Sequence, residues 1–134
     1  MNRYVLDASA LIAYLLHEDG AKIVEQILLA PLSECLAHSI NFCEVFYAIR
    51  RGGGEVRAQR AVSALTSNGI RMMDDIHPDF WMRVGRKKAA GGISLPDCFC
   101  LTLAEELGAV CITADRSEFM SVVKRVKCNI QFIR

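Results

Sequence analysis

Short apolar runs alternate with longer segments of helical periodicity along the chain. The short runs are typical of buried strands, and the longer segments place apolar residues three or four positions apart, as on one face of a helix. Such alternation is typical of a parallel sheet with helices on both faces, because each parallel connection must cross the sheet. We therefore predict an α/β fold with three α/β/α layers around a central, mostly parallel sheet.

The predicted elements follow one another without a repeat, a low-complexity tract or a linker, so residues 1–134 are expected to form a single domain. Strands are predicted at residues 4–6, 34–37, 70–73, 109–113 and 130–133. Helices are predicted at residues 10–16, 21–29, 41–50, 55–66, 77–88, 96–107 and 117–123. Glycines predict two breaks, a loop at Gly52–Gly54 and a flexible joint at Gly91–Gly92.

Composition narrows the class of protein. Hydrophobic residues make up 52% of the chain, which indicates a substantial core and excludes disorder. A net charge of +1 means that binding to nucleic acid would depend on local basic patches. An acidic residue at position 7 precludes a signal-peptide core, and no apolar stretch is long enough to span a bilayer. We expect a cytoplasmic protein whose six cysteines, none in a Cys-x-x-Cys pair, are free thiols.

Four acidic residues are placed where an α/β chain brings side chains together. Asp7 and Asp115 each follow a predicted strand, and Glu44 and Asp97 lie in helices. Ligands of parallel sheets bind at the carboxyl ends of the strands, so the four carboxylates are expected to converge on one crevice. Such a cluster repels itself unless it is protonated or bound to a cation. Oxygen ligands suit Mg²⁺ or Mn²⁺, which points to metal-dependent cleavage of phosphodiesters.

Each carboxylate also has a purely structural interpretation. Asp7 and Asp115 suit helix N-caps, and Asp115 with Glu118 resembles a capping box. The helix dipole alone would favour Asp97 in a first turn. Glu44 is harder to explain structurally, because no basic residue lies three or four positions away. Capping and metal binding therefore both stay open for Asp7 and Asp115.

The motifs around these acids resemble those of the PIN domain family, and more narrowly the VapC-type toxin ribonucleases of toxin–antitoxin pairs. The resemblance extends over nearly the whole chain. Its motifs are Tyr4-Val5-Leu6-Asp7-Ala8-Ser9-Ala10-Leu11, Asn41-Phe42-Cys43-Glu44-Val45, Leu95-Pro96-Asp97 and the segment from Leu107 to Phe119. The last motif, with Thr113 and Asp115 before a phenylalanine, is the most specific of the four.

The resemblance implies a PIN-like fold, a homodimer and an endoribonuclease that hydrolyses RNA with a metal-activated water. It also implies Mg²⁺ or Mn²⁺ as the cofactor and a small antitoxin as the partner that covers the site. Carried over residue by residue, the acidic metal-binding and catalytic positions are Asp7, Glu44, Asp97 and Asp115. Ser9 and Thr113 match the supporting hydroxyl positions, and Glu118 is an additional acid without an assigned role.

Basic residues form three groups, near Arg50, near Arg86 and near Lys124. We predict RNA-backbone contacts at Arg86, Lys87 and Lys88, which precede the glycine pair and the Asp97 helix, although an ordinary solvated helix face is the simpler interpretation. Two alternatives to a toxin stay open. One is a PIN-type nuclease that processes RNA, and the other is a non-catalytic binding module in which the acids serve as caps.

Overall fold

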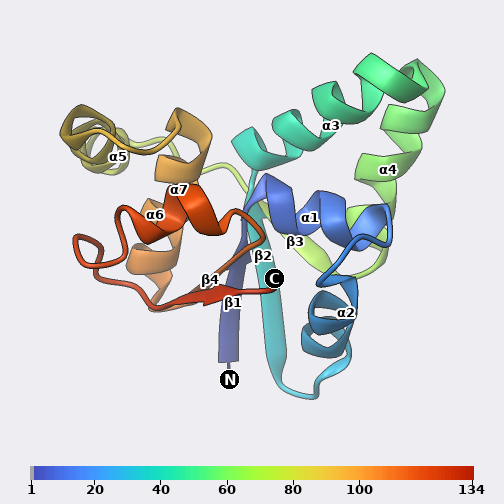
Figure 1. The fold of residues 1–134 in the computed structure, drawn as a ribbon, viewed down its shortest axis with the longest axis horizontal. Coiled ribbons are helices and arrows are strands. Elements are labelled where there is room, and N and C mark those ends of the chain that lie inside the picture. Colours follow the sequence, from blue (N-terminus) through green and yellow to red (C-terminus); the bar gives the residue numbers. More distant parts are fainter. Residues whose placement is uncertain (1) are drawn as a thin grey trace.

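The sheet of this protein has five parallel strands in the order β3-β2-β1-β4-β5, as the computed structural model of residues 2–134 shows (Figure 1). The strands are β1 (Asn2–Leu6), β2 (Ser33–His38), β3 (Ile70–Met73), β4 (Val110–Thr113) and β5 (Ile130–Phe132). The helices are α1 (Ala8–Leu15), α2 (Ala21–Leu29), α3 (Ser39–Gly53), α4 (Glu55–Ser67), α5 (Pro78–Ala90), α6 (Leu95–Leu107) and α7 (Arg116–Met120). The predicted α/β fold is confirmed, and the sheet is parallel throughout.

Helices cover both faces of the sheet, and each face has its own hydrophobic core. Neighbouring residues of a strand point to opposite faces, so Leu6 packs in the core with α1 to α4 while Val5 packs in the core with α5 to α7. Ile112 and Cys111 on β4 divide in the same way. Figure 1 shows α5, α6 and α7 on one side of the strands and α1, α2 and α4 on the other. The continuous apolar runs of the strands follow from this two-sided burial.

The predicted loop at Gly52–Gly54 was wrong, because Gly52 and Gly53 belong to the end of α3. Gly54 alone separates α3 from α4, with φ +85°. Its N–H donates to the carbonyl of Arg50 and its carbonyl accepts the N–H of Ala58. One residue with positive φ therefore ends one helix and starts the next, which glycine does without steric cost.

The strand order places a topological switch point beside Asp7. After β1 the chain builds β2 and β3 on one side, and it then crosses to build β4 and β5 on the other. The direction of winding thus changes between β1 and β4, which pair directly through Tyr4 to Leu6. Ligand sites of parallel sheets lie at such switch points, outside the carboxyl ends of the strands.

All six cysteines are free thiols, as predicted, and Cys35, Cys98, Cys100 and Cys111 are buried. The sulfur atoms of Cys100 on α6 and Cys111 on β4 lie 3.5 Å apart in the core. None of the helices formed by residues 2–134 combines the length and apolar character needed to cross a membrane.

Candidate active site

Asp7 is buried at the end of β1, where it receives three hydrogen bonds. Its Oδ1 accepts from the Ala10 N–H at 2.9 Å, which makes it the N-cap of α1, and from Ser9 Oγ at 2.8 Å. Its Oδ2 accepts from Thr113 Oγ1 at 2.6 Å. The structure therefore shows Asp7 in the capping role, and the same bonds fix its carboxylate at the switch point of the sheet.

Ser9 and Thr113 connect the ends of β1 and β4 through Asp7. Ser9 Oγ also accepts the Ala114 N–H at 2.9 Å, and Thr113 Oγ1 accepts the Asp115 N–H at 3.0 Å. Both hydroxyl protons point to Asp7, so the 3.2 Å approach between the two hydroxyl oxygens is a contact without a shared proton. These bonds orient Asp7 and leave no hydroxyl donor free.

Asp97, Asp115 and Glu118 bring carboxylate oxygens within 4.8 Å of one another. Asp97 is in the first turn of α6, which Ser94 caps, and only 7% of its surface is exposed. Asp115 caps the short helix α7 by accepting the Glu118 N–H at 3.1 Å. Glu118 in turn accepts the backbone N–H of Ser94 and so ties α7 to the start of α6. We call these three residues the acidic cluster.

Glu44 on α3 is held by Asn41 and lies near enough to Asp7 and Glu118 for their charges to act on it. The Asn41 side-chain amide donates to Glu44 Oε1 at 3.2 Å and to the Pro96 carbonyl at 3.2 Å. Because both partners are acceptors, the orientation of the amide is fixed. Asn41 Oδ1 is buried without a protein partner. This oxygen adds an unused acceptor next to the predicted site.

Burial and mutual repulsion raise the pKa values of the acids. Burial raises the pKa of Asp7 to about 6, against the opposing hydrogen bonds of Thr113, Ala10 and Ser9. Burial, then the charges of Asp7 and Glu118, raises the pKa of Asp97 to about 9. The pKa of Glu44 is raised by burial and by the charges of Asp7 and Glu118, although its bond to Asn41 lowers it. The carboxylates therefore act on one another electrostatically.

These residues suit a divalent metal ion with a preference for oxygen ligands. Within residues 2–134, no lysine, arginine or histidine forms an ion pair with Asp7, Glu44, Asp97, Asp115 or Glu118. Buried carboxylates without a protein cation need protons or a metal to offset their repulsion. The donors are all oxygen atoms, which match Mg²⁺ and Mn²⁺ and not the thiolate and imidazole ligands typical of zinc.

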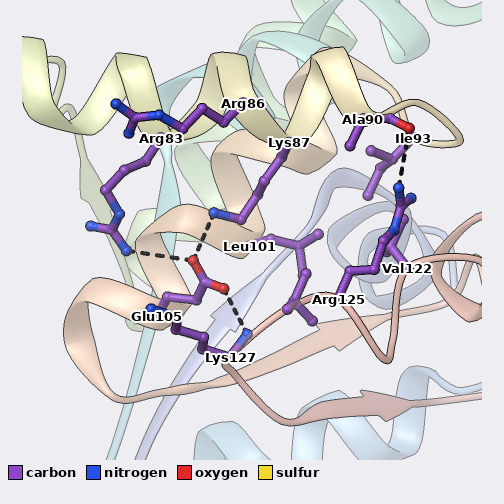
Figure 2. A pocket seen from close by; sticks show the side chains of 11 residues that line it. Arg83, Arg86, Lys87, Ala90, Ile93, Leu101, Glu105, Val122, Arg125 and Lys127 are labelled. Carbon is purple, nitrogen blue, oxygen red and sulfur yellow. Dashed lines mark hydrogen bonds and ion pairs between the residues drawn. The ribbon is translucent and has the colours of Figure 1, made fainter.

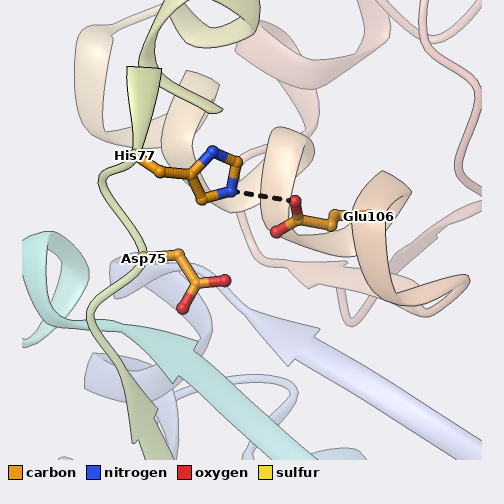
Figure 3. Close-up of side chains that lie close together, drawn as sticks. All are labelled: Asp75, His77 and Glu106. Carbon is orange, nitrogen blue, oxygen red and sulfur yellow. Dashed lines mark hydrogen bonds and ion pairs between the residues drawn. The ribbon is translucent and has the colours of Figure 1, made fainter. Parts of the chain in front are cut away.

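A second group of metal-type ligands, Asp75, His77 and Glu106, lies at the surface (Figure 3). His77 Nδ1 accepts the N–H of Phe80 and caps α5, so the neutral ring carries its proton on Nε2. That Nε2 donates to Glu106 Oε1 at 3.3 Å. Coordination of a metal by Nε2 would require the ring to lose this proton or the cap to break. His77 and Glu106 are therefore accounted for by capping and pairing.

The predicted RNA contacts are mostly engaged within the protein. Lys87 pairs with Glu105 at 2.7 Å, and Lys88 Nζ donates to the Ile93 carbonyl at 3.0 Å. Arg86 is exposed and has no acidic partner among residues 2–134. Of the three, only Lys87 has its charge paired with an acid among residues 2–134, and only the Arg86 side chain makes no hydrogen bond or ion pair there.

The sequence predicted no part in the active site for Asn41, Glu118 or Tyr47. Asn41 precedes Glu44 by one helical turn, which is the only sequence signal for their hydrogen bond. Glu118 was recognised as part of a capping box, but its proximity to Asp97 depends on how α6 packs against α7. Tyr47 is 41% exposed, one turn beyond Glu44, and the Arg51 guanidinium lies 4.9 Å from its ring centre.

The model of the PIN domain family matches residues 4–125. Solved structures of similar fold include VapBC-1 from nontypeable Haemophilus influenzae, with 22% identity, a TM-score of 0.70 and 98% of each chain covered. VapBC2 from Rickettsia felis, bound to a DNA fragment from its promoter, has 16% identity and a TM-score of 0.72, with 97% of this chain and 98% of that chain covered.

VapC20 from Mycobacterium tuberculosis, a sarcin-ricin loop cleaving toxin, shares 12% identity with a TM-score of 0.69, over 88% of this chain and 94% of that chain. At these identities the likeness to the solved structures shows a shared fold. None of the curated proteins matches the chain.

Proposed function

Because the chain belongs to the PIN domain family, we propose that it is a metal-dependent endoribonuclease, the toxin of a VapBC-type toxin–antitoxin pair. The observation that carries the proposal is the acidic cluster, whose carboxylate oxygens lie within 4.8 Å of one another without a cationic partner in residues 2–134. A site of that charge suits the hard metal ions used in phosphodiester hydrolysis.

Asp7, Glu44, Asp97 and Asp115 would hold Mg²⁺ or Mn²⁺, and the position of Glu118 adds it to this set. When bound, the ion supplies activation of a water molecule and stabilisation of negative charge on the phosphate. The protein orients the carboxylates that would hold the ion. Ser9 and Thr113 hold Asp7, Asn41 holds Glu44, and the caps of α6 and α7 hold the acidic cluster.

The partners follow from the same proposal. The substrate is RNA, and a small antitoxin in the same cytoplasm covers the site and inhibits cleavage. Support comes from the similar fold of VapBC-1 from Haemophilus influenzae and VapBC2 from Rickettsia felis, both toxin–antitoxin systems. We also propose a homodimer, because Trp81 and Met82 on α5 expose large apolar side chains, as does nearby Ile76.

A non-catalytic binding module is the second candidate function. The observation that favours it is that Asp7 and Asp115 both cap helices, so each has a structural role that requires no chemistry. Metal binding separates the two candidates, since a module whose acids serve only as caps gains no thermal stability from Mg²⁺ or Mn²⁺.

The test is cleavage of a labelled RNA pool by the isolated protein with Mg²⁺, with Mn²⁺ and with EDTA. Asp97→Asn is the inactivating variant, and Asp74→Asn, at an exposed acid outside the cluster, is its matched control. Discrete fragments that require both a metal and Asp97, and that persist in Asp74→Asn, are the expected result. Absence of cleavage by folded, partner-free protein in every condition would overturn the proposal.

A further inference from the structure

A pocket of about 380 Å³ lies between α5, α6 and the segment that follows α7 (Figure 2). Its volume is within the range of small-ligand sites. Basic side chains surround it, and we call it the basic pocket. They are Arg83, Arg86, Lys87, Arg125 and Lys127.

The charge of the basic pocket is only partly neutralised inside the protein. One acid lines it, Glu105, which pairs with Lys87 at 2.7 Å and Arg83 at 3.4 Å and accepts the Lys127 backbone N–H at 2.7 Å. The Arg125 guanidinium donates to the carbonyls of Ala90 and Gly91, which leaves its charge in place. Among residues 2–134, neither Arg86 nor the Lys127 ammonium has an acidic partner. The pocket therefore suits an anion.

Apolar side chains line the same pocket. Ala90, which is exposed, and Val126, which is half-buried, present apolar surface to it, above the buried side chains of Ile93, Leu101 and Val122. A ligand that carries only a phosphate would leave this apolar surface without a partner. A nucleotide combines a flat base for the apolar surface with a phosphate for the cations, as in recognition of unstacked bases in single-stranded RNA.

One short segment forms the wall between the basic pocket and the acidic cluster. On the pocket side, Arg125 donates to the Gly91 carbonyl at 2.7 Å and Ile93 lines the cavity. On the other side, the Ser94 N–H donates to Glu118. The predicted joint at Gly91–Gly92 lies between α5 and α6, where Arg125 donates to the Gly91 carbonyl and Ser121 donates to the Gly92 carbonyl. Residues 91–94 therefore contact both the pocket lining and the acidic cluster.

We propose that the basic pocket binds one nucleotide of the RNA strand that flanks the scissile phosphate, with its base against Ala90 and Val126 and its phosphate attracted by the charges of Arg86 and Lys127, which have no acidic partner among residues 2–134. The proposal rests on the nuclease function proposed above. RNA is favoured over an acidic protein segment because the pocket shares a wall with the acidic cluster, along which a bound strand continues.

Binding is measured in a cleavage-inactive background, Asp7→Asn with Asp97→Asn, using a fluorescent single-stranded RNA octamer in EDTA. The test variant adds Arg86→Ala with Lys127→Ala, which removes two charges without touching the Glu105 pairs. The matched control adds Arg57→Ala with Arg60→Ala on α4, which removes two exposed charges remote from the pocket. We expect roughly tenfold weaker binding for the test variant alone, with a salt dependence smaller by about 0.7 in log–log slope for each lost phosphate contact.

A second variant tests the apolar surface separately from the charge. Ala90 is exposed and lines the pocket, so Ala90→Trp narrows the cavity without altering the core. It is expected to weaken binding of the octamer severalfold with an unchanged Tm. An octamer of abasic ribose phosphates is expected to bind Ala90→Trp and its parent equally, because no base enters the pocket.

The outcomes separate this inference from the nuclease proposal. Equal RNA affinity in the test and control variants would overturn the inference even if the wild-type protein cleaves RNA. Affinity of the pocket for an oligoglutamate peptide, with no loss of RNA binding in the test variant, would also overturn it and assign the pocket to an acidic protein partner. Loss of RNA binding in the test variant alone would support it, whether or not wild-type protein cleaves RNA.

Discussion

Two nearly buried carboxylates on the same helix have opposite electrostatic surroundings. Asp97 begins α6 among Asp7, Glu44 and Glu118, and burial with these charges raises its pKa to about 9. Glu105 lies two turns later, where burial would raise its pKa, but the Lys127 N–H, Lys87 and Arg83 outweigh burial and lower it. Burial alone therefore does not mark a functional carboxylate. The neighbours decide whether the charge is already balanced or requires an external cation.

The largest expected effect is loss of activity in Asp97→Asn. Removal of a metal-binding carboxylate is expected to lower RNA cleavage by more than about a hundredfold, since metal affinity and charge stabilisation are lost together. Without metal the same variant is expected to be more stable, with Tm raised by roughly 5 °C, because a neutral amide can be buried beside Asp7 and Glu118 without first taking up a proton. Cleavage assays and thermal melts in EDTA measure the two effects. A less stable variant in EDTA would contradict the electrostatic argument.

Glu105→Gln is expected to lower the stability of the fold, whereas Asp97→Asn is expected to raise it in the absence of metal. It leaves Lys87 and Arg83 without their carboxylate and is expected to destabilise the fold by about 1–3 kcal/mol. Affinity for Mn²⁺ should change little, because Glu105 belongs to no metal-binding group in the described residues. Chemical denaturation measures the stability. A gain in stability would show that the pairs around Glu105 do not offset its burial.

Stability without metal should depend on pH in a direction set by the acids of the site. The folded-state pKa values of Asp7, about 6, and Asp97, about 9, lie above their ordinary value of 3.8. Their contribution is therefore fully present below pH 4 and is lost as pH rises, through about 6 for Asp7 and about 9 for Asp97. Glu105 acts oppositely, since its lowered pKa gives stability that is lost in acid.

Thermal melts in EDTA between pH 5 and pH 9 measure this dependence, and they are compared with melts of Asp97→Asn. The variant should lose less stability above pH 6 than the wild-type protein, because the group with a pKa of about 9 is gone. Identical pH profiles for the two proteins would contradict the assignment of that loss to Asp97.

The smallest expected effect on stability is that of Thr113→Val, which removes one hydrogen bond to Asp7 and keeps the side-chain shape. A cost of about 1–2 kcal/mol in the free energy of unfolding is expected, because the Asp115 N–H also loses its acceptor. Cleavage should fall by about tenfold or more, as Asp7 loses the 2.6 Å bond that orients it. Thr102→Val is the control for stability loss without an effect on cleavage. It removes a buried hydroxyl on α6 that donates to the Cys98 carbonyl and does not contact Asp7.

Much of the fold could be predicted from the sequence, because the five apolar runs and the helical periodicity are local signals. The convergence of Asp7 and Asp115 could also be predicted, because ligands of parallel sheets bind at the carboxyl ends of the strands. The nearness of Glu118 to Asp97 could not be predicted, since it depends on the packing of α7 against the start of α6. The engagement of Lys87 was missed for the same reason, because its partner Glu105 lies on the next helix.

The most direct test of the central claim is calorimetric titration of Mn²⁺ into the wild-type protein, Asp97→Asn and Glu105→Gln at the same pH. Binding is expected in the wild-type protein and in Glu105→Gln, and it should be lost or strongly weakened in Asp97→Asn, because only Asp97 belongs to the acidic cluster. Absence of binding to all three proteins, or equal binding to all three, would contradict the claim that the acidic cluster is a metal site.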